Sequence, residues 1–425
     1  MNGIEFGKAQ MIYDVLVIGG GPAGCKAAEL AGKAGMKVVL FEKEQLGGVC
    51  LNYGCIPTKS LLYGIKLYSQ MKNDAPLFGV TASEIVVDHN ALWKRAEQTM
   101  NRLRSALRYR LENSRVNIID GEALWQCKNS GIFEVSCGGQ IFCGQHLILA
   151  TGGQPLIPDI AGIRQGLQSG FVATPRDILK TPDIPQSLVI VGGGAIGMEF
   201  ATIYSGLGSR VTVIEKESSI GGGIDERISS FLLEFYRKRG VTFELSTVAT
   251  CVAENGLFLQ NGKHLNTDKI LLACGWESAL KQCCLTNLHV IGDANGRAFS
   301  APAAELEAEC ALRKILGQPD KRSYYYFPHV IFTTQEVAYW GQTLQQAKVV
   351  DPQATEVITP LCVSSRYAIE HPTENGFCIK VFSGKGILVG FHIIGTGAAE
   401  LLSSETKMPA HPSLSELTIS NSLKF

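Results

Sequence analysis

Asp14-Val-Leu-Val-Ile18 followed by Gly19-Gly20-Gly21-Pro22-Ala23-Gly24 is the stretch that decides the fold of this 425-residue chain. Its apolar run predicts a short buried strand, and the glycines predict a tight turn that opens a helix. An amphipathic stretch follows, and then a second strand pattern that ends at Glu42. The order of strand, glycine turn, helix, strand and acid is typical of a Rossmann dinucleotide-binding unit.

The chain contains this unit twice. Leu188 to Val191 leads into Gly192-Gly193-Gly194-Ala195-Ile196-Gly197, and the strand pattern that ends at Ile214 is followed by Glu215. In each unit the acid follows the first glycine by 23 positions, 42 − 19 and 215 − 192. Two accidental glycine turns are the alternative, but the repeated context favours two nucleotide sites.

Each position of the fingerprint has its own physical task. The first glycine permits the turn, the second lets the backbone approach a pyrophosphate at the helix N-terminus, the third allows close packing, and the acid takes ribose hydroxyls. We therefore predict a first nucleotide site at Gly19, Gly21, Gly24 and Glu42, and a second at Gly192, Gly194, Ile196, Gly197 and Glu215. Since the Glu215 carboxylate repels a 2′-phosphate, the second site should prefer NAD over NADP, although Lys216 is a nearby cation.

A cysteine pair, Cys50 and Cys55, lies within the run from Gly47 to Lys59. Residues five apart on a regular helix are about 140° apart, so only a distorted first turn could bring the two sulfurs into disulfide geometry. A helix start also stabilises a thiolate. A zinc pair and two inert thiols are the alternatives, and zinc would need further Cys or His ligands at close spacing, which are absent here.

The position of the pair assigns the nucleotides. Cys50 and Cys55 come shortly after Glu42, so the first nucleotide is the one near the sulfurs, and we expect it to be FAD. Leu288 to Asp293 predicts a strand that ends in Gly-Asp, and this aspartate could bind the flavin's ribityl hydroxyls. An ordinary strand-end turn is the alternative.

Composition narrows the class of protein. Lys plus Arg and Asp plus Glu are equal at 39 each, which argues against nucleic acid or anionic lipid as partners. No secretion signal or membrane span is apparent, so we expect a soluble, cytoplasmic protein. Thirteen cysteines, an odd number, do not suggest a secreted disulfide framework. The length predicts two or three domains.

Taken together, these motifs resemble the flavin-dependent pyridine nucleotide-disulphide oxidoreductases, and most closely the members that oxidise dihydrolipoamide. The resemblance runs from Tyr13 to about Glu416. Its most specific elements are Gly47 to Lys59, Ala150-Thr151-Gly152, Gly192 to Glu199, Ile291 to Ala294, and His411 to Glu416.

The resemblance implies a role for each element. Cys50 would be the thiol that meets the substrate, Cys55 the charge-transfer thiol against the flavin, and Lys59 with Glu199 the ion pair beside flavin N5. Further contacts to FAD would come from Gly48, Thr151, Gly152, Asp293 and Ala301, and a contact to NAD from Gly275. No metal site is expected.

His411 would be the acid-base histidine, oriented by Glu416 and contributed across a homodimer interface. The chemistry suits imidazole, because a dithiol attacks as its thiolate and imidazole titrates near working pH. Ser413 to Glu416 also fits a helix capping box, which is the alternative for that carboxylate. His392 is interpreted as a packing residue, and His329 stays undecided.

The chain departs from the family pattern in two shortened regions, between Trp276 and His289 and between Glu400 and His411. The second could shift His411 away from the partner's active site. Val49 and Pro302 stand where Thr and His are common in the family. The adjacent Cys283 and Cys284 could pair only with strain, so no redox role is assigned to them.

The predicted fold is α/β, with two Rossmann-like domains for FAD and NAD and a shortened C-terminal α+β dimerisation domain. We expect the FAD-binding domain at 1–155 and 285–322, the NAD-binding domain at 156–284 and the interface domain at 323–425. Alternating strand patterns with turns near Asn375 and Gly384 predict an antiparallel sheet in the last domain.

The predicted function is NAD-dependent oxidation of dihydrolipoamide to lipoamide through a Cys50–Cys55 redox disulfide and FAD. The substrate would be a small dithiol or a lipoyl domain, for a homodimer that serves a 2-oxo acid dehydrogenase or glycine cleavage complex. The alternatives are a related NAD(P)H-dependent disulfide or metal-ion reductase, and a flavin-binding module whose turnover is impaired by the shortened regions.

Overall fold

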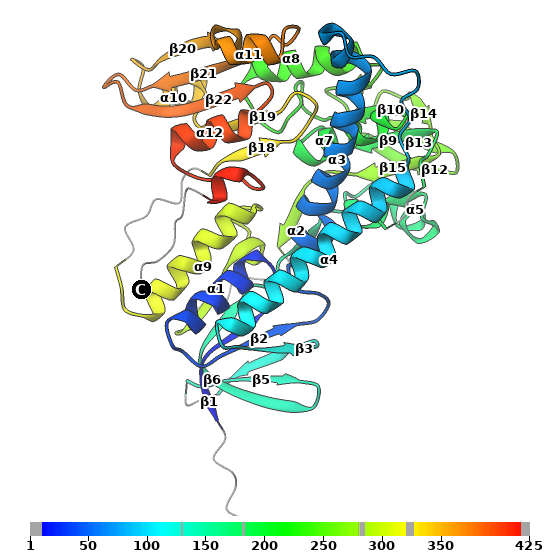
Figure 1. Cartoon of the computed structure of the whole chain (residues 1–425). Coiled ribbons are helices and arrows are strands. Elements are labelled where there is room, and N and C mark those ends of the chain that lie inside the picture. The colour runs from blue at the N-terminus through cyan, green and yellow to red at the C-terminus, as the bar shows by residue number, and fades with distance from the viewer. Residues whose placement is uncertain are drawn as a thin grey trace, which may run out of the picture.

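The computed structural model describes residues 11–128, 131–180, 183–278, 280, 285–319 and 327–417. Cys283 and Cys284 therefore lie outside the described residues. Three larger sheets organise the chain, each with its own helices (Figure 1). The predicted α/β class with two Rossmann-like units is confirmed, while the predicted domain boundaries stay a prediction.

The first sheet has the strand order β3-β2-β1-β6-β5-β4, with β17 beside β6. Its strands are β1 (Ile12–Ile18), β2 (Val38–Glu42), β3 (Val116–Asp120), β4 (Leu124–Cys127), β5 (Phe133–Cys137), β6 (Gln140–Leu149) and β17 (Leu288–Val290). β1, β2, β3, β6 and β17 are parallel where they pair. Helices cross over between β1 and β2 and between β2 and β3, as parallel neighbours require. β17 joins this sheet after the chain has formed the second one.

Helices cover this sheet and lead toward the second unit. They are α1 (Pro22–Lys33), α2 (Gly48–Tyr53), α3 (Cys55–Ser69), α4 (His89–Asn113) and α9 (Ala301–Ile315), with the short turns η1 (Gln70–Asp74), η2 (Ala75–Phe78) and η3 (Gly292–Asn295). α1 and α9 pack side by side (Figure 1). Small residues such as Ala27, Ala31 and Ala308 are fully buried in the same cluster, so the two helices approach closely.

The second parallel sheet has the order β11-β10-β9-β15-β8. Its strands are β8 (Val172–Ala173), β9 (Ser187–Val191), β10 (Arg210–Ile214), β11 (Thr242–Glu244) and β15 (Lys269–Leu272), and its helices are α5 (Ile163–Ser169), α6 (Pro175–Ile178), α7 (Ala195–Gly206) and α8 (Glu226–Arg237). A small antiparallel sheet is formed by β12 (Ala249–Ala253), β13 (Gly256–Leu259) and β14 (His264–Asn266). β7 (Gly153–Pro155) pairs with β16 (Trp276–Ser278), so the two segments that connect the first and second sheets run together.

The third sheet is antiparallel, with the order β18-β19-β22-β21-β20. Its strands are β18 (His329–Ile331), β19 (Val337–Gly341), β20 (Thr355–Pro360), β21 (Phe377–Phe382) and β22 (Leu388–Ile394). Around it lie α10 (Leu344–Val350), α11 (Ser365–Glu370), α12 (Ala398–Thr406), η4 (Leu361–Val363) and η5 (Leu414–Leu417). The antiparallel pairing predicted for the C-terminal region is confirmed.

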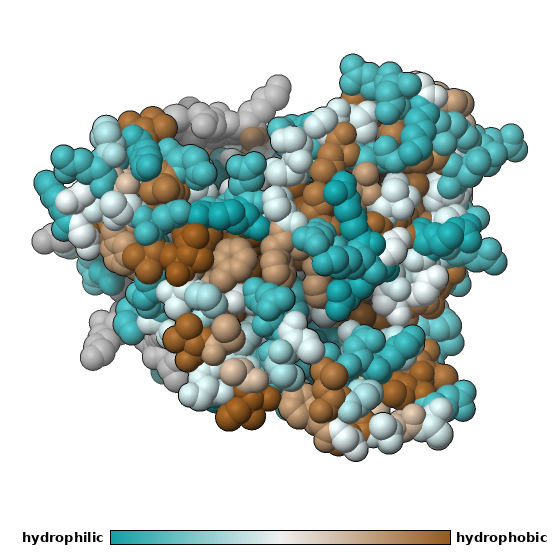
Figure 2. All heavy atoms as spheres, turned by 90° about the horizontal axis from the view of Figure 1, so that it is seen from above, coloured by the Kyte–Doolittle hydropathy of each residue, from teal (hydrophilic) through white to brown (hydrophobic). Residues whose placement is uncertain are grey.

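Apolar side chains on the outer face gather in patches among polar ones, as seen from above in Figure 2. The edge strand β20 and the segments after it contribute the exposed Ile358, Val363 and Ile369. Among the described residues, no helix combines the length and apolar character that a membrane span requires.

Candidate functional site

The two glycine turns have nearly the same geometry. Gly19 and Gly192 begin them with φ of +104° and +111°, a region that disfavours side chains. A Cβ on Gly24 would lie 1.9 Å from the Gly19 carbonyl oxygen, and a Cβ on Gly197 would lie 1.9 Å from that of Gly192. The first and third positions of both turns therefore exclude any larger residue, as the fingerprint predicts.

The second glycines face open space instead. A Cβ on Gly194 would meet no atom within 4 Å, and a Cβ on Gly21 would meet only the Gly48 Cα, at 3.9 Å. Each lies at the N-terminus of a 12-residue helix, α7 or α1. Bare backbone, free space and a helix N-terminus suit a pyrophosphate, so both turns fit a dinucleotide.

The two predicted acids occupy equivalent places. Glu42 Oε2 accepts a hydrogen bond from the Gly20 N–H at 2.6 Å, and Glu215 Oε2 accepts one from the Gly193 N–H at 2.7 Å. Both carboxylates are thus held against their glycine turns. Their predicted contacts to ribose hydroxyls stay predictions.

The remaining cofactor candidates collect at the carboxyl ends of the parallel strands. Thr151 and Gly152 follow β6, the neighbour of β1, and Asp293 follows β17, the neighbour of β6. In the second unit Gly275 follows β15, the neighbour of β9, and Ile196 lies in the first turn of α7. Ligands of open α/β sheets bind at this edge, so these positions suit cofactor contacts, which stay predictions.

The first site also adjoins the cysteines. Gly48, with φ of +55°, begins α2 directly against the glycine turn, since a Cβ there would lie 2.7 Å from the Gly21 Cα. Ala301, another residue expected to contact FAD, is the first residue of α9. Burial, together with the charges of Cys55 and Glu307, raises the pKa of Asp293 to about 6.

Cys50 and Cys55 lie on two separate helices. Cys50 is in α2, the chain breaks at Gly54, and Cys55 is the first residue of the 15-residue α3. Both thiols are free in this structure, and their Sγ atoms and a nitrogen of His411 all lie within 4.8 Å of one another. The break supplies the distortion that the spacing required.

The pKa values of the two thiols are shifted in opposite directions. A hydrogen bond from Cys50, despite the opposing effect of burial, lowers the pKa of Cys55 well below its usual value, with His411 and Lys59 adding to the effect. The same hydrogen bond raises the pKa of Cys50. The N-terminus of α3 also favours a thiolate at Cys55. In the reduced pair these shifts favour a thiolate at Cys55 over one at Cys50.

His411 lies against this pair. Its Nε2 is 3.2 Å from Cys50 Sγ, and its Nδ1 is 3.1 Å from Glu416 Oε1. Burial alone would lower the pKa of His411, but Cys55 and Glu416 outweigh it and raise that pKa to about 10. Glu416 Oε1 also accepts from the Ser413 N–H at 2.9 Å, so both predicted roles of this carboxylate have a matching contact.

The contact between Cys50 and His411 is made within one chain, across 361 positions of the sequence. The contact across a homodimer interface that the resemblance implied stays a prediction. The three groups could also hold a thiophilic metal ion. Close spacing in the sequence does not reveal these three ligands, because the fold, and not the local sequence, brings His411 to the two cysteines.

Lys59 and Glu199 form a mostly buried ion pair. Lys59 Nζ lies 2.8 Å from Glu199 Oε2, and Glu199 Oε1 accepts from the Phe332 N–H at 3.0 Å. Burial opposes the charged ammonium, but Glu199 and Cys55 nevertheless raise the pKa of Lys59. α3 carries both Cys55 and Lys59, so the cation lies about one helical turn from the thiolate.

Two acids near the site were missed by the sequence reasoning. Glu400 accepts the N–H groups of Leu414 and Ser415, at 2.7 and 3.1 Å, and so holds the loop that carries His411. Glu305, on α9, lies close enough for charge interaction with His411. Neither acid belongs to a recognisable motif, so only the fold reveals them.

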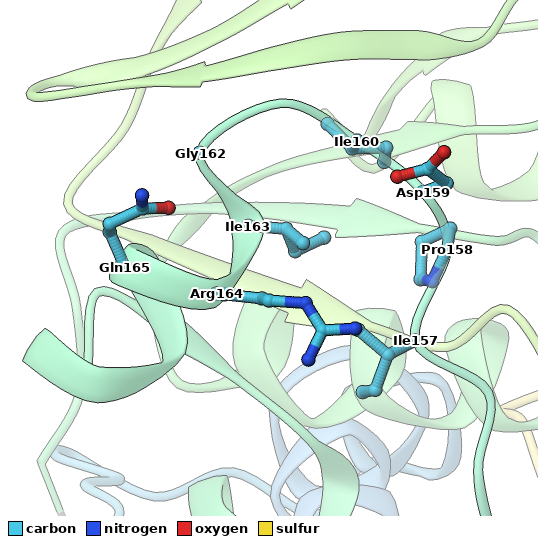
Figure 3. A pocket seen from close by; sticks show the side chains of 8 residues that line it. All are labelled: Ile157, Pro158, Asp159, Ile160, Gly162, Ile163, Arg164 and Gln165. Carbon is cyan, nitrogen blue, oxygen red and sulfur yellow. The ribbon is translucent and has the colours of Figure 1, made fainter.

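The other predicted histidines lie elsewhere. His392 is buried in β22, with Nε2 3.0 Å from the Gln342 carbonyl oxygen, which fits the predicted packing role. His329 stacks on Tyr339 in the same sheet. A hollow of about 310 Å³ before α5, where Arg164 reaches toward Ile157, contains none of the predicted site residues (Figure 3).

Comparison with known proteins agrees with this geometry. Residues 13–295 match the family of pyridine nucleotide-disulphide oxidoreductases. The chain is similar to the dihydrolipoyl dehydrogenase of Mycoplasma genitalium, with 30% identity over 97% of this chain and 95% of the relative. It is also similar to that of Bacillus subtilis, with 29% identity over 96% and 95%.

Solved structures share the fold. The HOCl-induced flavoprotein disulfide reductase RclA from Escherichia coli superposes with a TM-score of 0.78 at 24% identity, over 95% of this chain and 98% of that one. Its Cu(II) complex gives a TM-score of 0.78 at 23% identity, over 96% and 98%. At this identity the likeness concerns architecture.

Proposed function

The chain belongs to the pyridine nucleotide-disulphide oxidoreductase family, and on that premise we propose that it oxidises dihydrolipoamide to lipoamide with NAD as the final acceptor. It is a flavin-dependent disulfide oxidoreductase, and the relatives named dihydrolipoyl dehydrogenase support the narrower activity. The single observation that carries the proposal is the contact of 3.2 Å between Cys50 Sγ and His411 Nε2, beside a thiol pair at a nucleotide turn.

In the oxidised state the two sulfurs form a disulfide. His411 takes a proton from one thiol of the substrate, and the resulting thiolate attacks Cys50 Sγ, which releases Cys55 as a thiolate. The second substrate thiol then attacks the substrate sulfur of the mixed disulfide and gives its proton to Cys50, which leaves as a thiol while the disulfide of lipoamide closes. Two electrons pass to the cysteine pair, which becomes one thiol and one thiolate.

The charges of the site favour this outcome. The lowered pKa of Cys55 makes it the better leaving group, and the raised pKa of His411 lets the imidazole keep the proton it has taken. Glu416 fixes the histidine ring and stabilises its charged form. Lys59, held by Glu199, adds a positive charge beside the Cys55 thiolate.

FAD at the first glycine turn and NAD at the second would supply the two-electron acceptors that return the pair to its disulfide. Gly21, Gly48, Thr151, Gly152, Asp293 and Ala301 are the residues expected to hold FAD, and Gly194, Ile196, Glu215 and Gly275 those expected to hold NAD. The open space over Gly21 and Gly194 supports this assignment.

The proposed partner is a free dithiol or the lipoyl domain of a 2-oxo acid dehydrogenase or glycine cleavage complex, in the cytoplasm. A module without turnover is less well supported, because thiols, histidine and carboxylate are in reach of one another despite the shortened regions.

The test is steady-state turnover of the purified protein with dihydrolipoamide and NAD. We expect NADH formation that Cys50→Ser abolishes while bound flavin is kept. Bound flavin without turnover would refute the proposed activity, and turnover only with another disulfide or a metal ion would move the protein to a different reductase of the same family.

A further inference from the structure

A buried amide connects the start of the cysteine helix to the long helix beside it. Asn52, on α2, is buried and uses both ends of its side-chain amide. Its Nδ2 donates toward the carbonyl oxygens of Gln45, Leu46 and Gly48, at 3.2, 3.1 and 2.9 Å. Its Oδ1 accepts from Arg104 of α4, from Nη2 at 2.8 Å and from Nε at 3.2 Å. One side chain therefore holds the loop before α2 and is itself held by α4, which lies beside α2 (Figure 1).

Arg104 sets the direction in which the Asn52 amide points. A guanidinium group has only donors, so it must face the oxygen of the amide, and the NH₂ group must then face the loop. Hydrogen bonds from a charged donor are also stronger than those between neutral groups. Arg104 is held in turn, since its Nη1 donates to Asn101 Oδ1 at 3.2 Å, about one turn earlier on α4. Without Arg104, the Asn52 amide would lose both of these donors and would be free to turn around.

The loop that Asn52 holds has a backbone that needs such support. Gly47 and Gly48 are both left-handed, with φ of +96° and +55°. α2 has only six residues, and no side chain caps its N-terminus. A helix this short is unstable unless other parts of the protein hold it. The three carbonyl groups bound by Asn52 therefore fix the point at which α2 begins.

That point matters for the proposed flavin site and for the thiols. The Gly47 N–H donates to the Gly20 carbonyl oxygen at 2.7 Å, and Gly48 lies directly against Gly21 of the first glycine turn. α2 then carries Cys50 two residues further along. A shift of this loop would move the backbone expected to face the FAD pyrophosphate and the first cysteine together.

We propose that Arg104 and Asn52 form a positioning pair, which sets the place of Gly48 against the FAD pyrophosphate and of Cys50 beside Cys55. This rests on the proposed binding of FAD at the first glycine turn. Neither side chain takes part in the chemistry. Arg104 acts on the site through the amide, and the amide acts through the carbonyl groups of the loop.

Two variants and a matched control test the pair. Arg104→Met keeps an apolar stem but removes every donor. Asn52→Asp keeps the shape of the side chain and its bonds to Arg104, but an oxygen replaces the NH₂ group that faces the carbonyl groups. The control is Arg108→Met, about one turn further along α4, where the arginine bonds to Asp120 instead of Asn52.

The first readout is the rate at which the holoprotein releases flavin, followed by flavin fluorescence below the Tm of each variant. Arg104→Met and Asn52→Asp should release flavin at least about tenfold faster than the wild type, because each disrupts hydrogen bonds that fix the loop. Arg108→Met should release it at the wild-type rate. The second readout is the charge-transfer absorbance with one equivalent of NADH, which should be lower in Arg104→Met and Asn52→Asp only.

A role in stability alone would give a different pattern. Asn52→Asp turns the contact with Arg104 into an ion pair, so a side chain that only joined α2 to α4 would leave both readouts unchanged in this variant. Wild-type flavin release and absorbance in either Arg104→Met or Asn52→Asp would overturn the proposal. If Asn52→Asp does not fold, the comparison of Arg104→Met with Arg108→Met decides.

The outcome is separate from that of the proposed function. A wild type that binds flavin but turns over no dihydrolipoamide would refute the proposed activity, while flavin release would still test the pair. For a protein without flavin, the test is hydrogen exchange at the Leu51 N–H, which donates to the Gly47 carbonyl oxygen at 3.3 Å. This exchange should be at least about tenfold faster in Arg104→Met than in Arg108→Met, since the first turn of α2 would open more often. Equal exchange rates would overturn the proposal.

Discussion

Replacing Gly194 by alanine should weaken NAD binding without harming the fold. Gly194 is the N-cap of α7, with φ of −73° and ψ of −169°, a conformation that alanine adopts without strain. The new methyl group would meet no protein atom within 4 Å. It would fill the space into which the proposed NAD pyrophosphate must come.

The expected free energies are small for folding and larger for binding. Fewer unfolded conformations should stabilise the variant by about 0.4–1 kcal/mol. Loss of a glycine N-cap should cost a comparable amount, about 0.5–1 kcal/mol. The net change in the free energy of unfolding is therefore under about 1 kcal/mol. A methyl group that keeps the pyrophosphate from the backbone should cost at least about 1.4 kcal/mol of binding, a tenfold loss of affinity.

The assay compares the KM for NAD, the flavin content and the Tm of Gly194→Ala with those of the wild type. Gly21→Ala is the matched control in the first unit, and it should lose flavin instead. Gly197→Ala, whose Cβ would lie 1.9 Å from the Gly192 carbonyl oxygen, should destabilise the protein outright. An unchanged KM in well-folded Gly194→Ala, or loss of flavin from it, would refute the assignment of NAD to this turn.

Three further variants probe the site. Glu199→Gln leaves the mostly buried Lys59 ammonium unpaired and should destabilise the protein by about 3 kcal/mol, seen as a lower Tm. The double variant Lys59→Met/Glu199→Leu removes both charges and should recover most of this loss. Equal Tm values for the two variants would contradict the argument. Glu416→Gln keeps an acceptor for the Ser413 N–H but removes a charge that raises the pKa of His411 toward 10. The charged His411 stabilises the fold fully below its usual pKa of 6.5, and this stabilisation is lost as pH rises toward 10. With the cysteines kept reduced, the Tm of Glu416→Gln should therefore decline at lower pH than the Tm of the wild type. Coinciding curves of Tm against pH would contradict this role of Glu416. Glu215→Ala removes the carboxylate that repels a 2′-phosphate and should raise the ratio of kcat/KM for NADP over NAD at least tenfold, while an unchanged ratio would show that other residues set the preference.

The sequence predicted the nucleotide turns because their determinants are local. The positive φ of Gly19 and the close approach of Gly24 to its carbonyl oxygen depend on residues five positions apart. The same holds for Gly192 and Gly197 in the second unit, so a short pattern was sufficient for both.

The thiol site was predicted only in part, because its parts are distant in the chain. The sequence could not show that α2 breaks at Gly54, nor that the loop after α12 returns to Cys50. The sequence did not indicate Glu400 and Glu305 as site residues, because their roles depend on packing between α12, α9 and the loop that carries His411. The resemblance supplied His411 as a candidate but implied that it serves a partner chain.

The most direct test of the dithiol mechanism is an anaerobic titration of the purified, flavin-containing protein with NADH. One equivalent should produce a long-wavelength charge-transfer absorbance from the Cys55 thiolate against the flavin. Cys55→Ser should retain flavin but lack that absorbance, while Cys50→Ser should show it without any reductant. If NADH bleaches the flavin with no such absorbance, or if Cys55→Ser gives the wild-type spectrum, the Cys50–Cys55 pair does not exchange electrons with the flavin.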